Sequence, residues 1–141
     1  MEKQVQYKFS RMELAQFATF DEAYSPDVKE VQFQTNAQFS FDKEHNIICS
    51  SITVIMSAQS STLIKAELRS YFDLLPESIE TLREDQSIVF PPEVLIQFAS
   101  LCYGSMRGVL FAKTIGSPLA DFILPPVFFN SIITSGFSVP V

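Results

Sequence analysis

Apolar and polar residues alternate through the first 75 positions, which is the period-two pattern of half-buried β-strands. The pattern changes phase within the first segment, because its apolar positions are first odd-numbered (Val5, Tyr7 and Phe9) and then even-numbered (Met12 and Leu14). Phe17 and Phe20 follow at a spacing of three. We therefore expect a first strand that is split by a bulge or a bend.

Three further alternating segments follow, and short polar stretches separate these three from one another. The cleanest runs from Val31 to Phe41, the next from Ile48 to Ala58, and the last from Ile64 to Leu74. The polar residues 42–46 and 59–61 between them are typical of turns. Four strands joined in this way predict an antiparallel meander or Greek-key-like sheet with one face in water.

The period changes after residue 75. Residues 76–90 are an acidic linker in which Glu77, Glu80, Glu84 and Asp85 surround two apolar residues, and we expect at most a short helical turn there. Pro92 directly follows another proline, and a further proline comes two residues after Gly116. Proline is tolerated in the first turn of a helix and glycine ends one, so Pro92–Ile115 predicts one long helix.

The predicted helix is apolar around most of its circumference, so we expect it to lie between its own sheet and another subunit. Gly104 and Gly108 would permit a close helix crossing, although they would equally well only weaken the helix. The chain is thus expected to be one α+β domain: a sheet over 1–75, the linker over 76–90, the helix over 91–116, and an extended apolar tail over 117–141. The end of the tail is expected to be weakly helical or frayed.

Composition favours self-association and argues against several classes of partner. Hydrophobic residues make up 47% of the chain, including 14 Phe, which is more apolar surface than a small monomer buries easily. The net charge of −6 argues against nucleic acid and anionic membranes and favours basic partners. Met1–Ser10 does not resemble a signal peptide, and prolines interrupt the uncharged stretch Phe122–Val141, so we expect a cytoplasmic protein without membrane insertion.

The residues indicate a binding protein rather than an enzyme. The one histidine, His45, lies in a predicted turn without a partner placed by spacing. Cys49 and Cys102 lie far apart in apolar segments, which is typical of reduced core cysteines and cannot supply a zinc set. Four glycines form no phosphate-binding loop. We therefore expect no cofactor, no metal and no catalytic residues.

The order of these elements resembles the SecB export-chaperone family. The resemblance is carried by Arg107 in the long helix, by Gly116 at its end, by the run Leu119–Leu124, and by the element Pro126–Phe129. Lys65–Leu68 with Tyr71 and Phe72 after it is similar to a strand of that family. The resemblance covers about Val5 to Phe129.

Membership of that family would imply an ATP-independent holdase, a homo-tetramer built as a dimer of dimers, which binds unfolded preproteins in apolar grooves and passes them to the SecA motor. The implied client-binding residues are Tyr71, Phe72, Leu74, Leu75, Phe90 and Tyr103. The alternative is that these side chains are ordinary core residues, above all Leu74. The implied oligomer interface contains Phe98, Gly104, Arg107, Gly108 and Phe111, and Glu67 would dock the basic zinc tail of the motor.

Two departures from the family keep other functions open. Leu14 and Ala18 occupy first-strand positions that are acidic in the family, and its C-terminal helix and acidic tail are short or missing after Phe129. A dedicated SecB-like chaperone for a single client, such as the antitoxin of a toxin–antitoxin pair, is therefore an alternative to the export holdase. A carrier of small apolar ligands that uses the Phe-rich face of the sheet is a third.

Overall fold

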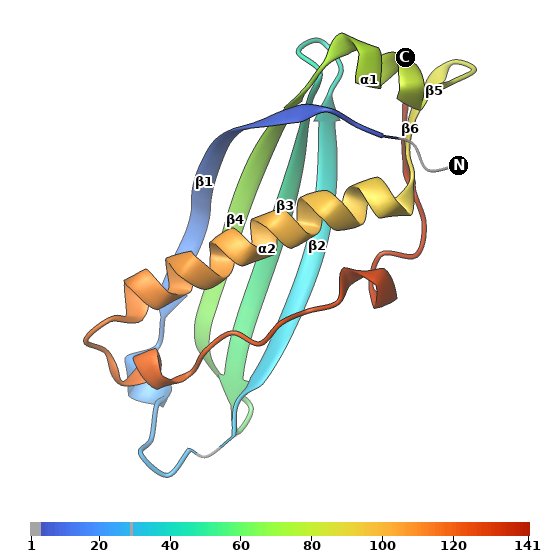
Figure 1. Cartoon of the computed structure of the whole chain (residues 1–141). Coiled ribbons are helices and arrows are strands. Elements are labelled where there is room, and N and C mark those ends of the chain that lie inside the picture. Colours follow the sequence, from blue (N-terminus) through green and yellow to red (C-terminus); the bar gives the residue numbers. More distant parts are fainter. Residues whose placement is uncertain (1–3, 29) are drawn as a thin grey trace.

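A computed structural model describes residues 4–28 and 30–141 of the chain. Four long strands form one antiparallel sheet: β1 (Tyr7–Thr19), β2 (Gln32–Asp42), β3 (Ile47–Ala58) and β4 (Ser61–Leu74). Their spatial order is β1-β4-β3-β2, so β4 returns to lie beside β1 in a Greek-key arrangement (Figure 1). With the helix described below, this is the predicted α+β fold.

Two irregularities in β1 account for the phase changes of its sequence. The register with β4 shifts between Phe9 and Arg11 and again between Leu14 and Gln16. Each shift adds one residue to β1, so the apolar side chains on either side of it still point to the same face of the sheet. The predicted bulge is confirmed, and the strand contains two of them.

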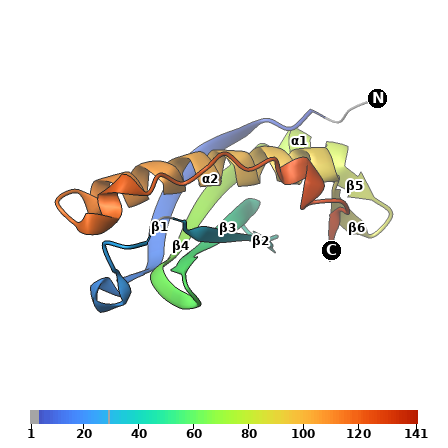
Figure 2. The ribbon, with the colours of Figure 1, turned by 90° about the horizontal axis from the view of Figure 1, so that it is seen from below.

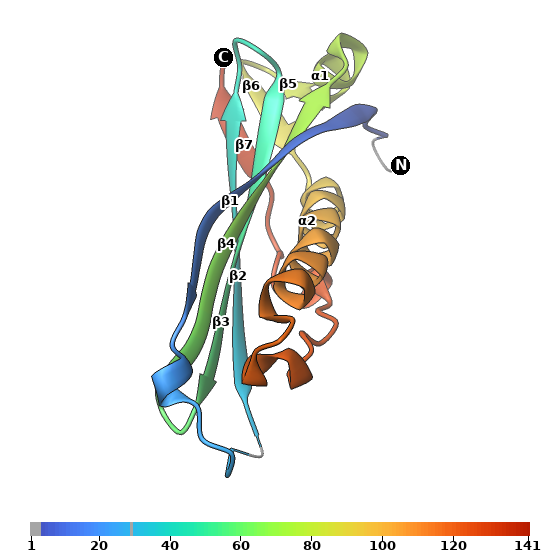
Figure 3. The same ribbon diagram turned by 90° about the vertical axis from the view of Figure 1, so that its left-hand side faces the viewer.

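The long helix α2 (Pro92–Thr114) crosses one face of the sheet, which we call the inner face (Figure 3). It begins directly after Pro91 and ends one residue before the predicted limit, close to Gly116, whose φ of +83° suits glycine. Nine of its residues are buried. The helix is long and apolar enough to cross a membrane by length and composition, but its buried stripe packs on the sheet, as in the core helix of a globular protein.

Residues 76–90, predicted as a linker, contain regular structure. They form a short helix α1 (Pro76–Leu82) and two short strands, β5 (Arg83–Glu84) and β6 (Ser87–Phe90). A last strand, β7 (Phe137–Pro140), pairs with β6 and completes a second sheet of order β5-β6-β7. The expectation of a frayed C-terminal end is therefore wrong. A four-residue strand whose partner lies about 50 residues away leaves too weak a pattern to be recognised in the sequence.

The tail between α2 and β7 is extended, as predicted, and it covers the part of the inner face that α2 leaves free. After the 3-10 helix η2 (Pro118–Asp121), residues 122–128, here called the strap, run back beside α2 in the same layer (Figures 1 and 2). Tyr103 donates its hydroxyl hydrogen to the carbonyl of Pro125, and Arg107 Nε donates to the carbonyl of Leu124 at 3.1 Å. The strap leads to the 3-10 helix η3 (Phe129–Ser131), which is followed by β7.

Phe72 of β4 lies at the centre of the core between the sheet and α2. Its side chain is 0% exposed, and its ring lies 4.5 Å from that of Phe98 on α2 and 5.5 Å from that of Tyr7 on β1. Rings at such separations add favourable edge and tilted contacts to the burial itself. These aromatic contacts join the helix to both central and edge strands.

We expect Phe72→Ala to lower the free energy of unfolding by about 3–5 kcal/mol, because it leaves a cavity under α2. Leu75→Ala is the matched control: Leu75 is 44% exposed, and its truncation is expected to cost no more than about 0.5 kcal/mol. Urea unfolding followed by circular dichroism measures both. Equal losses in the two variants would contradict this packing.

Candidate functional site: a groove at the free edge of β2

A groove of about 430 Å³ lies between β2, the start of α2 and the segment that connects η3 to β7. Three stretches that are distant in sequence contribute to it. No residue that lines it carries an ionisable side chain; they are Ala37, Gln38, Phe39, Leu95, Ile132, Ile133, Thr134, Ser135, Gly136 and Phe137. An uncharged groove that combines apolar side chains with neutral polar groups suits a small uncharged ligand or an uncharged stretch of polypeptide.

The floor of the groove follows from one small residue in β2. The inner positions of this strand alternate as Phe33, Thr35, Ala37, Phe39 and Phe41, and all of them are half-buried. Ala37 is the smallest of the five, so the row of large side chains is interrupted there. The recess over Ala37 is therefore encoded in the sequence, although the alternation alone did not identify it as a site.

The edge of β2 beside the groove is open to hydrogen bonding. β2 is the last strand of the sheet, and within the described part of the chain only β3 pairs with its backbone. Every second residue of such an edge strand directs its backbone N–H and C=O groups outward. At the opposite edge two bulges and the charged residues Lys8, Arg11 and Glu13 interrupt β1, which are features that discourage strand addition.

The other face of the sheet, here called the outer face, carries a network of charged residues. Glu67 accepts hydrogen bonds from Ser51 at 2.9 Å and from Arg69 at 3.0 Å, and these contacts lower its pKa. Arg69 also reaches Glu13 at 3.3 Å, and Arg11 stacks on Tyr71 at 4.1 Å.

Acidic and basic residues are balanced on this outer face. By the strand register, Lys8, Arg11, Lys65 and Arg69 share it with Glu13, Asp42, Glu67 and Asp73. Four positive charges therefore match four negative ones. Glu67, the predicted docking residue for a basic tail, is already paired and does not belong to an acidic patch.

Most of the predicted client-binding residues are not available at the surface. Phe72, Leu74, Phe90 and Tyr103 are buried in the core, so they are not accessible to a client in this conformation, and their role in binding stays a prediction. The pattern of apolar residues cannot distinguish a groove from a core, because both require large apolar side chains. Tyr71 lies on the outer face, opposite to Phe72, and Leu75 is exposed next to α1.

The predicted interface residues divide between core and surface. Phe98 is buried against Phe72 and is not accessible to a second copy in this conformation, so its role as an interface residue stays a prediction. Gly104, Arg107, Gly108 and Phe111 are exposed residues of α2, outside its buried stripe. A Cβ atom added at either glycine would meet nothing within 4 Å inside the chain, so no close helix crossing occurs within the protomer.

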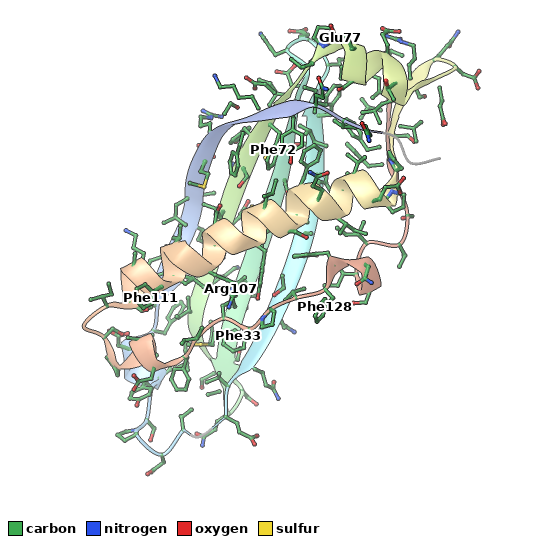
Figure 4. The ribbon with its side chains drawn as sticks, in the orientation of Figure 1. Phe33, Phe72, Glu77, Arg107, Phe111 and Phe128 are labelled. Carbon is green, nitrogen blue, oxygen red and sulfur yellow. The ribbon has the colours of Figure 1, made fainter. Side chains whose placement is uncertain are left out.

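Apolar side chains extend this exposed side of α2 onto the strap. Phe111 is 64% exposed, Ile123 72% and Phe128 75%. Figure 4 places Phe111 and Phe128 at opposite ends of the layer that α2 and the strap form. We call Phe111, Ile123 and Phe128, together with the surface of α2 between them, the helix–strap surface.

A possible set of metal ligands lies in the turn between β2 and β3. Ligand atoms of Asp42, Glu44 and His45 lie within 4.8 Å of one another, and all three residues are exposed. His45 Nδ1 lies 2.8 Å from Asp42 Oδ2, and this hydrogen bond raises the pKa of His45 and lowers the pKa of Asp42. The histidine predicted to be without a partner thus has one, in an exposed ion pair of the kind that contributes little to stability.

No protein-family model matches this chain, and no curated protein matches it either. Among solved structures, the fold is similar to that of the Mycobacterium tuberculosis Rv1957 SecB-like chaperone, in a complex with a ChAD peptide from the Rv1956 HigA1 antitoxin. The match has a TM-score of 0.59 at 11% sequence identity, and it covers 86% of this chain and 90% of that one. The chain therefore has the fold of a SecB-like chaperone, as the order of its elements predicted.

Both cysteines are expected to be unreactive in the folded protein. Burial raises the pKa of the Cys49 thiol, and it raises that of Cys102 to about 11. Because the thiolate is the reactive form, neither residue should react with Ellman's reagent at pH 8 until the protein is unfolded, when both should react. Rapid reaction of one thiol in the native protein would show that the core over that residue is open.

Proposed function

We propose that this protein is an ATP-independent chaperone that holds an unfolded segment of one dedicated client in the groove at the edge of β2. The observation that carries the proposal is the combination of an uncharged recess, lined in part by apolar side chains, with an unpaired strand edge. A segment of unfolded polypeptide needs both, since its apolar side chains must leave water and its backbone groups need hydrogen-bond partners. The fold of the Rv1957 SecB-like chaperone supports this assignment.

Two observations favour a dedicated client over general export. The similar solved structure holds a peptide from an antitoxin. On the outer face, Arg69 pairs with both Glu13 and Glu67, and basic and acidic residues are equal in number, so a basic tail such as that of the SecA motor would find no acidic patch there. General binding of preproteins and delivery to SecA are therefore less well supported than the binding of one dedicated client.

The groove also refines the expected chemistry of the client. The net charge of −6 alone favours basic partners. A lysine or arginine buried in this groove would find no carboxylate among the lining residues, and an unpaired buried charge is costly. The segment that enters is therefore apolar and uncharged, whatever charges lie outside it in the client.

The helix–strap surface supports assembly into a homo-oligomer, proposed here to be a tetramer built as a dimer of dimers. Large exposed apolar side chains along one face of a monomer favour self-association. A second copy packed on α2 would also account for why this helix is apolar around most of its circumference. We expect the assembled protein to act in the cytoplasm, without a cofactor and without catalytic activity.

A carrier of small apolar molecules is the second candidate, and the volume and lining of the groove favour it. The groove borders a free strand edge, however, and a small apolar molecule has no use for unpaired backbone groups. The chaperone therefore accounts for one feature that the carrier does not.

We expect Ala37→Phe to fill the recess and to reduce, at least about tenfold, the capacity of the protein to prevent aggregation of a urea-unfolded test protein after dilution. Asn36→Phe is the matched control, because it adds the same side chain to the outer face of the same strand. Light scattering at increasing chaperone ratios measures both variants. Wild-type capacity in Ala37→Phe would place the client elsewhere.

Gly108→Leu is expected to dissociate the proposed oligomer while leaving the protomer folded. The added side chain meets nothing within the chain, so only a second copy would collide with it. Multi-angle light scattering should give a mass near that of one or two 15.9 kDa chains in the variant and four in the wild type. A variant with the wild-type mass would rule out a close crossing at this position.

A further inference from the structure

The far wall of the groove is formed by the segment between η3 and β7, and two anchors hold it in place. At one end Phe129 is buried, with its ring 5.6 Å from that of Tyr103, and Ile132 and Ile133 donate their backbone N–H groups to its carbonyl. At the other end β7 pairs with β6, and Phe137 stacks on Phe90 at 6.0 Å. Within the wall Ile133 is also buried. The position of β7 therefore determines how far the part of the wall after Ile133, residues 134–136, stands from β2.

With this wall in place the groove is too short for a strand. Its lining includes only Ala37, Gln38 and Phe39 of β2, which is about 10 Å of strand at about 3.4 Å per residue. Added strands that pair stably run to about 17–20 Å.

The attachment of β7 is weak compared with the rest of the fold. β7 has four residues, of which only Phe137 and Val139 are half-buried and the other two are exposed. The hydrogen bond from Val141 N to Gln86 O fixes the alternation, so Pro140 falls at a position whose nitrogen points away from β6. Short peripheral elements with few buried side chains open at a much lower free energy than the core.

Gly136 is the residue that lets the wall close fully. A Cβ atom at this position would lie 2.6 Å from the carbonyl oxygen of Phe90, which is a backbone atom that cannot turn aside. Any other residue at 136 must therefore move the wall away from β6. The wall therefore makes a close backbone contact with Phe90 at the point where it joins β7.

We infer that β7 is a latch on the client groove: its release from β6 frees the part of the wall formed by residues 134–136 and widens the groove beside β2, and Gly136 sets how tightly the latch closes. This inference rests on the proposed function, because it concerns the same groove. The latch determines which clients are accepted. A single apolar side chain enters the closed groove, whereas an extended segment requires the latch to open.

A disulfide across the latch tests the inference directly. Val89 and Ser138 are register partners at a position between hydrogen-bonded pairs, where side chains lie closest. In Val89→Cys/Ser138→Cys, oxidation should lock the latch and lower, by about tenfold or more, the capacity to prevent aggregation of a urea-unfolded test protein. Reduction should restore it, so the same molecule is its own control. Equal capacity in both redox states would overturn the latch.

Gly136→Ala should act in the opposite direction, and Ser135→Ala is its matched control in the same exposed segment. Hydrogen exchange of the wild type should show β6 amides exchanging far faster than those of β3 and β4. Gly136→Ala should accelerate β6 exchange a further tenfold or so, and Ser135→Ala should not. Exchange of β6 as slow as that of the central strands would also overturn the latch.

Hydrogen exchange needs no client, so it tests the latch separately from the proposed function. If wild-type protein fails to prevent aggregation but β6 opens as described, the proposed function fails and the latch remains a property of the fold. If wild-type protein holds its client and the oxidised variant does so equally well, the function stands and the latch is wrong.

Discussion

The inner face of the sheet must be covered, and one helix is not enough to cover it. Four strands spaced about 4.8 Å apart and up to 14 residues long present a broad apolar face, whereas a helix with its side chains is about 10–12 Å wide. α2 therefore crosses the face and buries one stripe of it, and the tail returns beside α2 to cover part of the rest. Leu119, Leu124, Phe129 and Ile133 anchor the tail in the core.

The groove and the helix–strap surface both follow from this covering. The tail passes near β2 without pairing with it, so the edge of that strand keeps its free backbone groups and a recess remains over Ala37. The same layer exposes large apolar side chains on its other side, including Phe111 and Phe128. One layer thus borders the candidate client site and supplies the candidate contact between protomers, so assembly and client binding would be physically connected.

Much of the fold could be predicted because it is encoded in local patterns. Alternation located the four strands and even the irregularity in β1, and prolines and Gly116 located α2 within one residue. The second sheet could not be found in this way, since β6 and β7 are four residues long and far apart in the chain. The predicted linker therefore contained structure that only its distant partner reveals.

The site was harder to predict than the fold for a related reason. Phe72 and Phe90 have the character expected of a groove, but the same character is required of a core, and tertiary packing placed both in the core. The groove instead combines Ala37, Leu95 and residues 132–137, which come together only in three dimensions. A local signal did exist, because Ala37 interrupts a row of larger residues in an edge strand that carries no charge as far as Phe41.

The most direct test of the proposed client site is a hydrogen-exchange footprint of this protein in the presence of an unfolded test protein. If the client binds at the edge of β2, we expect slower exchange in β2, Gln32–Asp42, where added backbone partners protect the free edge. We also expect altered exchange in residues 132–137. Protection confined to the outer-face network around Glu67 and Arg69, with β2 unchanged, would contradict this site.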